Sequence, residues 1–193
     1  MGQHSEKAAM RQEIKVKLPQ KSSAATLEGS RVACEFLVGL PEWESAWTVM
    51  LYLSLPGEIE TAYALESAWE AGKTVLVPRV DWGSHEINAI PIALDSPTQY
   101  ARYGLREPTE GRPFDPARID LIAVPGLAFD GRGHRLGRGA GFYDRFLPRA
   151  TRATRAGLAW ELQFVEAVPT TASDAVLDAL VTEESVRRFE RSG

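Results

Sequence analysis

The first part of the chain has the hydrophobic spacing of helices. A polar start leads into a helical region that Pro19 interrupts. Beyond this break, apolar residues recur at near-helical spacing up to Pro41, namely Leu27, Cys34, Leu37 and Val38. The pattern predicts two helices ahead of the first strand.

Short apolar runs follow, and two of them flank a helical segment. Residues 47–55, WTVMLYLSL, are typical of a buried strand, which a Pro-Gly pair ends. Thr61 is placed to cap a helix that Gly72 terminates, and residues 74–80, TVLVPRV, are rich in β-branched side chains. A strand, a helix and a strand of these lengths are typical of a parallel crossover, so the pattern predicts an open α/β sheet.

The rest of the chain adds strands around a long connection. Residues 119–129 form the strongest apolar run, and residues 94–116 read as an irregular connection because they are rich in Pro, Gly and Asp. The other predicted elements are strands at 87–92, 156–160 and 176–181 and a helix at 140–149. We expect a single three-layer α/β domain over residues 1–193, in which helices flank an open, mostly parallel, twisted sheet. We expect residues 1–5 and 184–193 to be loosely ordered.

Composition and charge exclude several classes of protein. The formal net charge is -4, so the long-range field opposes nonspecific binding of the whole surface to nucleic acid or an anionic membrane. The single cysteine, Cys34, cannot form a disulfide within the chain, and the three histidines lack a zinc-binding spacing. No apolar run has the length of a membrane span. We expect a cytoplasmic monomer that binds small molecules and has neither a membrane nor a nucleic acid as partner.

Glycine gathers between the strongest apolar run and the helix predicted after it. Residues 129–147 read FDGRGHRLGRGAGFYDRFL and include Gly133, Gly137, Gly139 and Gly141. A backbone without side chains lets several amide N–H groups converge on one anion, and the following helix would add its positive end. The segment is therefore typical of a phosphate-binding loop.

The charges in this region favour the same interpretation. Seven arginines lie between Arg132 and Arg155, against one acid, Asp144, in a chain that is acidic overall. Guanidinium groups match phosphate and carboxylate oxygens, and a carboxylate beside a polyphosphate is a usual magnesium ligand. The alternative is a tight glycine turn followed by a solvated helix face, since neither standard nucleotide fingerprint is present. From the residues alone we predict an anion-binding loop for a nucleotide.

Residues 125–147, PGLAFDGRGHRLGRGAGFYDRFL, are similar throughout to the signature of the 5-formyltetrahydrofolate cyclo-ligase family, also called methenyltetrahydrofolate synthetases. Four further segments resemble family motifs in the same order: 7–11 (KAAMR), 53–61 (LSLPGEIET), 77–79 (VPR) and 177–183 (LDALVTE). The chain departs from the family pattern at Ala140, Phe142 and Leu177, where Gly or Lys, Tyr, and Val are commoner. Residues 82–114 match only loosely.

The resemblance implies an enzyme that converts 5-formyltetrahydrofolate to 5,10-methenyltetrahydrofolate, with ATP as co-substrate and Mg²⁺ as cofactor. It implies phosphorylation of the formyl oxygen and ring closure by N10, with release of ADP and phosphate. It implies ATP contacts for Lys7, Arg11, Arg135, Leu136, Gly137, Arg138, Gly139, Ala140, Gly141, Phe142 and Tyr143. It implies folate contacts for Leu53, Glu58, Arg138, Gly139, Ala140, Gly141 and Phe142, magnesium at Asp144 and Asp178, and catalytic roles for Arg138 and Glu58.

Structural alternatives exist for these residues. They are an exposed helix face for Lys7 and Arg11, a turn or cap for Glu58, a structural cap or pair for Asp178, and core packing for Leu53, Phe142 and Tyr143. The arginines near the predicted helix suit either a solvated surface or a folate polyglutamate tail; they are Arg145, Arg149, Arg152 and Arg155. Two other functions stay open: another ATP-using enzyme on this scaffold, and a noncatalytic nucleotide- or RNA-binding relative. The joint presence of metal and folate carboxylates favours the enzyme.

Overall fold

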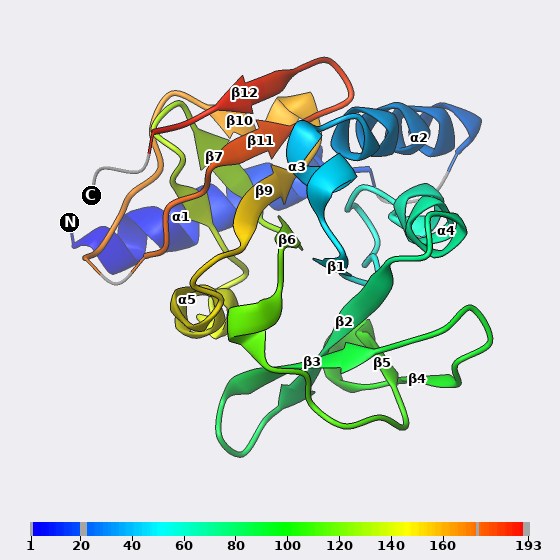
Figure 1. Cartoon of the computed structure of the whole chain (residues 1–193). Coiled ribbons are helices and arrows are strands. Elements are labelled where there is room, and N and C mark those ends of the chain that lie inside the picture. Colours follow the sequence, from blue (N-terminus) through cyan, green and yellow to red (C-terminus); the bar gives the residue numbers. More distant parts are fainter. Residues whose placement is uncertain (1, 20–22, 173, 191–193) are drawn as a thin grey trace.

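The computed structural model describes residues 2–19, 23–172 and 174–190 (Figure 1). Its helices are α1 (Gln3–Lys17), α2 (Ala24–Val38), α3 (Pro41–Ser45), α4 (Ala62–Glu70) and α5 (Phe142–Phe146). Its strands are β1 (Thr48–Met50), β2 (Thr74–Asp81), β3 (Glu86–Pro91), β4 (Thr98–Tyr100), β5 (Arg106–Pro108), β6 (Leu121–Val124), β7 (Ala128–Asp130), β8 (Arg135–Leu136), β9 (Thr154–Leu158), β10 (Phe164–Val165), β11 (Ala179–Val181) and β12 (Val186–Arg188). Short 3-10 turns lie at Arg102–Gly104 (η1), Pro116–Arg118 (η2), Leu147–Arg149 (η3) and Glu161–Gln163 (η4).

The large sheet has seven strands in the order β12-β11-β9-β6-β1-β2-β3. Its five inner strands run parallel, and the edge strands β3 and β12 pair antiparallel with their neighbours. The predicted open, mostly parallel α/β sheet is confirmed. The chain adds β2 on one side of β1 and then continues with β6 on the other. Ligands bind at such a junction in open α/β sheets, beyond the carboxyl ends of the strands.

The sheet is the middle layer of three. Successive side chains of a strand point to opposite faces, so Val49 and Met50 enter different hydrophobic clusters. The cluster around Val49 includes buried side chains of α1, α2, α3 and α4. The cluster around Met50 includes Phe146 of α5 and Leu147 of η3. Helices therefore cover both faces of the sheet, as the sequence pattern predicts.

Two smaller sheets carry segments that matter for the site. Strands β7, β8 and β10 form one of them, and β4 and β5 form a hairpin. The apolar run at 119–129, predicted as one strand, is divided between β6 of the large sheet and β7 of the small one. Gly126 lies at the break, where a Cβ would come within 2.6 Å of the Phe129 ring. This close approach explains the glycine, because any side chain would displace a buried aromatic ring.

β1 is shorter than the predicted strand at 47–55, because the strand pairing ends with the bond from the Leu51 amide to the Leu76 carbonyl, and the chain then leads to α4. The Thr61 hydroxyl donates to the Tyr52 carbonyl at 2.6 Å, and the Thr61 amide donates to the Ser54 hydroxyl at 3.0 Å. Thr61 is the N-cap residue of α4, as predicted, yet its side chain makes no cap hydrogen bond to the helix. These bonds fix the segment that follows β1 at the edge of the sheet where the parallel strands end.

The prediction of an irregular connection over residues 94–116 is wrong for the β4–β5 hairpin that lies within it. The N-terminal residues are also more regular than predicted, since α1 begins at Gln3. The helix predicted at 140–149 is confirmed in a shorter form, as α5 followed by η3. None of the helices in the described ranges combines the length and the apolar character needed to cross a bilayer.

The prediction of a loosely ordered end from residue 184 is wrong for Val186–Arg188, which pairs with β11 as β12. The Arg187 guanidinium bonds to Glu161 at 2.6 Å and lies 4.1 Å from the centre of the Phe164 ring. A short strand with two arginines is ordered here by contacts that include residues far away in the sequence. A local hydrophobic pattern does not reveal such contacts.

Candidate active site

The predicted phosphate loop joins β8 to α5 through residues 137–141. Gly139 (φ 117°) and Gly141 (φ 68°) adopt positive φ angles, which strain residues with a side chain, so this backbone path requires glycine. The helix that follows has only five residues, too few to supply the helix-end charge that the sequence predicts. Positive charge at the loop therefore comes from basic side chains.

Arg135 lies beneath the loop on β8. Only 2% of its side chain is exposed, and its Nη2 donates to Oδ1 of Asp144 at 2.9 Å. Its guanidinium also lies 5.6 Å from the centre of the Tyr143 ring. Burial lowers the pKa of Arg135, while the charges of Asp144 and Asp174 oppose that shift. Two carboxylates thus stabilise one buried cation below the loop.

Arg138 and Glu58 connect the loop to the carboxyl end of β1. The Arg138 Nε and Nη2 atoms both donate to Oε1 of Glu58, at 3.1 and 2.8 Å. The other carboxylate oxygen, Oε2, accepts from the backbone amide of Leu55 at 3.0 Å. The Glu58 side chain is 9% exposed and that of Arg138 is 41% exposed. The two predicted catalytic residues are therefore in direct contact.

Helix α1 contributes two more basic side chains, Lys7 and Arg11, to the region around the loop. Nε of Arg11 donates to the carbonyl oxygen of Gly137 in the loop at 2.9 Å. Nζ of Lys7 donates to Oδ2 of Asp174 at 2.6 Å, with both side chains largely buried. These contacts replace the alternative of two cations on an exposed helix face.

Asp174 was not predicted as a site residue, although it lies beside three that were. Burial alone would raise the pKa of Asp174. The hydrogen bonds from Lys7 and from the Thr171 amide outweigh burial and lower this pKa, which favours the carboxylate. The backbone amide of the next residue, Ala175, donates to Oδ1 of Asp144 at 3.5 Å. No spacing rule could have selected Asp174, because it comes to the loop only through the tertiary fold.

Asp178 has a different environment. Its Oδ2 accepts from the backbone amide of Arg155 at 2.7 Å, at the amino ends of the neighbouring strands β9 and β11. This bond matches the structural alternative for Asp178. Across the described ranges, the His, Cys, Asp and Glu side chains form no group of three or more suited to a metal ion. A magnesium site with few protein carboxylates would rely on phosphate oxygens and water for its other ligands.

A pocket of about 620 Å³ lies on the other side of Glu58. Its walls come from the segment after β1, from α2, from the β4–β5 hairpin and from the segment after β9; they include Thr26, Ser30, Ser54, Pro56, Glu58, Glu60, Tyr100, Tyr103, Arg106 and Trp160. Tyr103 is 84% exposed and has a positive φ of 60°. Sequence reasoning selected Glu58 but missed Tyr100 and Tyr103, since two tyrosines in a polar connection give no signal of a pocket. Leu53, a predicted folate contact, packs partly buried against the hydrophobic core.

Tyr143 follows the loop, with its ring near the Arg135 guanidinium. Its hydroxyl is buried and has no hydrogen-bond partner among the residues that the structure describes. Burial and the nearby charge of Glu58 raise the pKa of Tyr143, while Arg135 opposes that shift. The hydroxyl is therefore neutral and can donate a hydrogen bond to a ligand.

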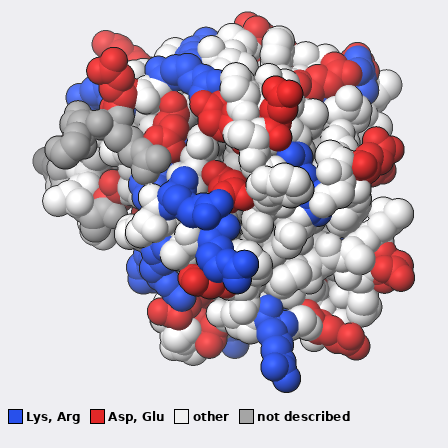
Figure 2. Space-filling model, viewed as in Figure 1, with Lys and Arg blue, Asp and Glu red and all other residues white. Residues whose placement is uncertain are grey.

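The arginines beyond the loop bond to the protein itself. Arg145 donates to the carbonyls of His85 and Ala140, and Arg155 to those of Leu147 and Val176. The other two arginines pair with carboxylates, since Arg149 lies 3.5 Å from Glu86 and Arg152 bonds to Asp120. On the face of the molecule that Figure 2 draws, basic and acidic side chains are interspersed. These contacts favour structural roles over the attraction of a polyglutamate tail.

The hairpin that presents Arg135 depends on Asp130 at the end of β7. The Asp130 side chain is fully buried, and its carboxylate accepts from the backbone amides of Arg132, His134 and Val168 at 2.9 to 3.1 Å. Burial opposes the charge, but these bonds together lower the pKa of Asp130. One carboxylate thus ties the β7–β8 turn to the segment after β10.

A glycine-rich loop joined by an ion pair to a pocket, beside the segment that leaves the carboxyl end of β1, is the arrangement of an α/β protein with a small-molecule site. The family model described as "5-formyltetrahydrofolate cyclo-ligase family" matches residues 3–183. The chain belongs to this family.

Relatives and solved structures agree with this assignment. The 5-formyltetrahydrofolate cyclo-ligase of Escherichia coli K12 is 32% identical over 82% of this chain and 90% of its own length. The mouse 5-formyltetrahydrofolate cyclo-ligase is 27% identical over 94% of this chain and 96% of its own. The solved structure of Aquifex aeolicus 5,10-methenyltetrahydrofolate synthetase is 33% identical, covers 97% of this chain and 94% of its own, and has a TM-score of 0.84.

Replacing Asp130 by Asn should destabilise the protein and change its response to acid. The lowered pKa means that Asp130 stabilises the fold above its unfolded pKa and loses this effect as the pH falls through its folded pKa. We expect Asp130→Asn to lower the free energy of unfolding by about 1–3 kcal/mol at neutral pH and to flatten its decline below about pH 4. Urea unfolding at several pH values measures both effects. The exposed Asp95→Asn is the control, and equal acid slopes in Asp130→Asn and wild type would contradict this role.

Proposed function

We propose that the chain converts 5-formyltetrahydrofolate to 5,10-methenyltetrahydrofolate in an ATP- and Mg²⁺-dependent reaction that releases ADP and phosphate. Family membership and the names of the relatives support the reaction. The observation that carries the proposal in this chain is the Arg138–Glu58 pair, which joins the glycine-rich loop to the wall of a pocket. A transferring phosphoryl group and an acceptor from the pocket would meet at this pair.

The pocket suits the folate. Its volume lies within the range of about 300–1,000 Å³ that is usual for small-molecule sites. Tyr100, Tyr103 and Trp160 offer aromatic faces for the flat pterin ring, and Glu58 offers a carboxylate that accepts hydrogen bonds from its N–H groups. Folate contacts thus involve pocket residues in addition to those implied by the family motifs.

The loop suits the phosphates of ATP. Lys7, Arg11, Arg135 and Arg138 surround it, and each already bonds to a carboxylate or a carbonyl that phosphate oxygens could replace. The hydroxyl of Tyr143 has a donor that a ligand oxygen would satisfy. Phosphoryl transfer depends mainly on position and electrostatics, which this group of donors supplies.

The reaction requires activation of an amide. The formyl oxygen attacks the γ-phosphorus of ATP, the new O–P bond forms, and the P–O bond to ADP breaks. N10 then adds to the carbon of the resulting N5-iminium phosphate, its proton is lost, and the C–O bond breaks to release phosphate. Arg138 stabilises charge on the transferring group while Glu58 holds the reacting end of the folate.

We place magnesium on Asp144 and Asp174 in this proposal, in place of Asp144 and Asp178. Asp174 lies beside Lys7 and Arg135, whereas the Asp178 carboxylate bonds to the backbone of Arg155 away from the loop. Carboxylates with phosphate oxygens are a usual ligand set for Mg²⁺, which would neutralise charge on the phosphates. We also retain the cytoplasmic monomer as part of the proposal.

A noncatalytic RNA-binding relative is the second candidate, and the contacts count against it. Proteins that track a nucleic-acid backbone carry Lys and Arg clustered on one face. Here Arg149 lies near Glu86 and Arg152 bonds to Asp120, so carboxylates interrupt the basic surface beyond the loop. An acidic pocket wall at Glu58 and Glu60 would also repel a phosphate backbone.

The path of the formyl oxygen tests the proposed chemistry. Substrate labelled with oxygen-18 in the formyl group should yield phosphate that carries the label, because that oxygen leaves with phosphorus. Mass spectrometry of the released phosphate measures the label. Unlabelled phosphate, with full product formation, would contradict phosphorylation of the formyl oxygen.

Carboxylate variants test the metal assignment. Asp144→Asn and Asp174→Asn should each raise the Mg²⁺ concentration needed for half-maximal turnover by at least about tenfold, because each removes a charged ligand. Asp178→Asn is the matched control and should leave the titration unchanged. A shift in Asp178→Asn without a shift in Asp174→Asn would return the site to Asp178.

A further inference from the structure

Aromatic side chains from three separate segments meet between the pocket and the loop. Trp82 follows β2 at the tip of the β2–β3 hairpin. Its ring centre lies 5.5 Å from that of Tyr103, on η1, and 5.2 Å from that of Phe142, at the start of α5. His85 from the same hairpin stacks on Phe142 at 6.2 Å. Trp82 is thus the middle member of a contact chain from Tyr103 to Phe142.

Arg145 holds the hairpin against the loop. Its Nε donates to the carbonyl of His85 at 2.8 Å and its Nη2 to the carbonyl of Ala140 at 2.9 Å. Its guanidinium also lies 5.5 Å from the centre of the Phe142 ring. A single side chain therefore fastens the tip of the hairpin to the backbone of the glycine-rich loop.

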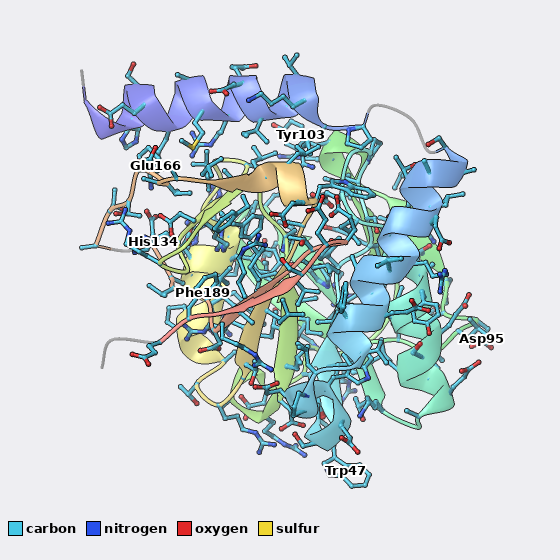
Figure 3. The ribbon with its side chains drawn as sticks, turned by 90° about the horizontal axis from the view of Figure 1, so that it is seen from above. Trp47, Asp95, Tyr103, His134, Glu166 and Phe189 are labelled. Carbon is cyan, nitrogen blue, oxygen red and sulfur yellow. The ribbon has the colours of Figure 1, made fainter. Side chains whose placement is uncertain are left out.

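The two ends of this chain belong to the two proposed ligand sites. Tyr103 lines the pocket, and Phe142 directly follows Gly141 and precedes Tyr143 and Asp144. Figure 3 shows Tyr103 on the side of the molecule covered by α1, far from Trp47. A ligand that packs on Tyr103 would restrict the ring of Tyr103, which contacts Trp82. Trp82 in turn contacts Phe142 at the end of the loop.

Packing keeps Trp82 in place. Its indole Nε1 is buried and has no hydrogen-bond partner in the described part of the chain. The Arg102 side chain lies 5.4 Å from its ring centre. On the neighbouring strand end, Oε1 of Glu107 accepts from the Val80 amide at 2.9 Å, which ties β5 to β2. An unpaired buried donor is unfavourable, so its presence here favours a role that depends on the ring.

We propose that Trp82 is a positioning residue that couples occupancy of the folate pocket to ordering of the glycine-rich loop. Folate on Tyr103 restricts Trp82 and Phe142, so a nucleotide that binds next meets a loop that is already ordered. Coupling of this kind is reciprocal, and each ligand strengthens the binding of the other by the same factor. The inference rests on the proposed function.

Calorimetry with MgADP, in the absence and presence of saturating 5-formyltetrahydrofolate, measures the coupling. ADP lacks the γ-phosphate, so direct contact between the transferring group and the formyl oxygen does not contribute. In wild type we expect the folate to tighten MgADP binding by about fivefold or more, the lower end of usual coupling factors, and in Trp82→Ala by less than about twofold. MgADP binding alone should stay within about twofold of wild type, because Trp82 reaches the loop only through the Phe142 ring and bonds to none of the cations proposed to hold the phosphates.

Trp47→Ala is the matched control, since Trp47 is 79% exposed and lies away from both sites. It should keep the wild-type coupling. If Trp82→Ala does not fold, Arg145→Gln takes its place, because Arg145 is exposed and its loss removes the bonds between hairpin and loop. A folded variant with reduced coupling supports the proposal.

Full coupling in the folded Trp82 variant, or in the Arg145 variant that replaces it, would overturn the proposal. A wild type that binds both ligands independently would also overturn it and would leave the proposed function standing. A wild type that binds neither ligand would overturn the proposed function and this inference together.

Discussion

The ion pair between Glu58 and Arg138 is the contact on which the site depends. It joins the segment after β1 to the glycine-rich loop, which are 80 residues apart in the sequence. Arg138 is partly exposed, so the pair adds little to the stability of the fold. Its importance is geometric, because two donors on one carboxylate oxygen fix the direction of the guanidinium, and the Leu55 amide fixes the carboxylate.

The rest of the architecture places the two partners of this pair. β1 lies beside β6 in the large sheet, and the loop follows β8 of the small sheet and reaches the segment after β1 through Arg138 and Glu58. Asp130 supports the β7–β8 turn, and α1 closes the site from one side through Arg11. Most of the basic side chains at the site face a carboxylate, which explains how an acidic chain holds a local group of cations without a wide positive surface.

Local signals in the sequence predicted much of the fold. The β-branched run that forms β2 and the apolar spacing that forms α2 report burial within one element, and burial leaves a periodic pattern. The glycine-rich loop could also be predicted from the sequence, because its glycines and arginines lie close together in one short segment. β12 was missed because its order comes from pairing with β11 and from Arg187 on Phe164. Two of its three residues are arginines, so it carries no such pattern.

The residues of the site fall into two similar groups, those that the sequence could predict and those that only the fold brings together. Residues in contiguous motifs, such as Arg135 and Arg138, could be selected before the structure was known, and the family resemblance added Lys7 and Glu58. Asp174 and Tyr103 could not, because each reaches the site through a turn of the chain that no spacing records. Contact between distant segments is a property of the fold, and only the fold distinguishes Asp174 from Asp178.

The central claim is that the loop and the pocket act together on a folate and ATP, and product absorbance tests it most directly. Wild-type protein is mixed with 5-formyltetrahydrofolate, Mg²⁺ and ATP, and the methenyl-folate band is followed, with ATP omitted in a parallel sample. The account predicts growth of the band only with ATP, and growth at least about a hundredfold slower in folded Arg138→Ala, because a charge-stabilising donor is lost. No growth of the band, in a folded protein that binds both ligands, would contradict the account.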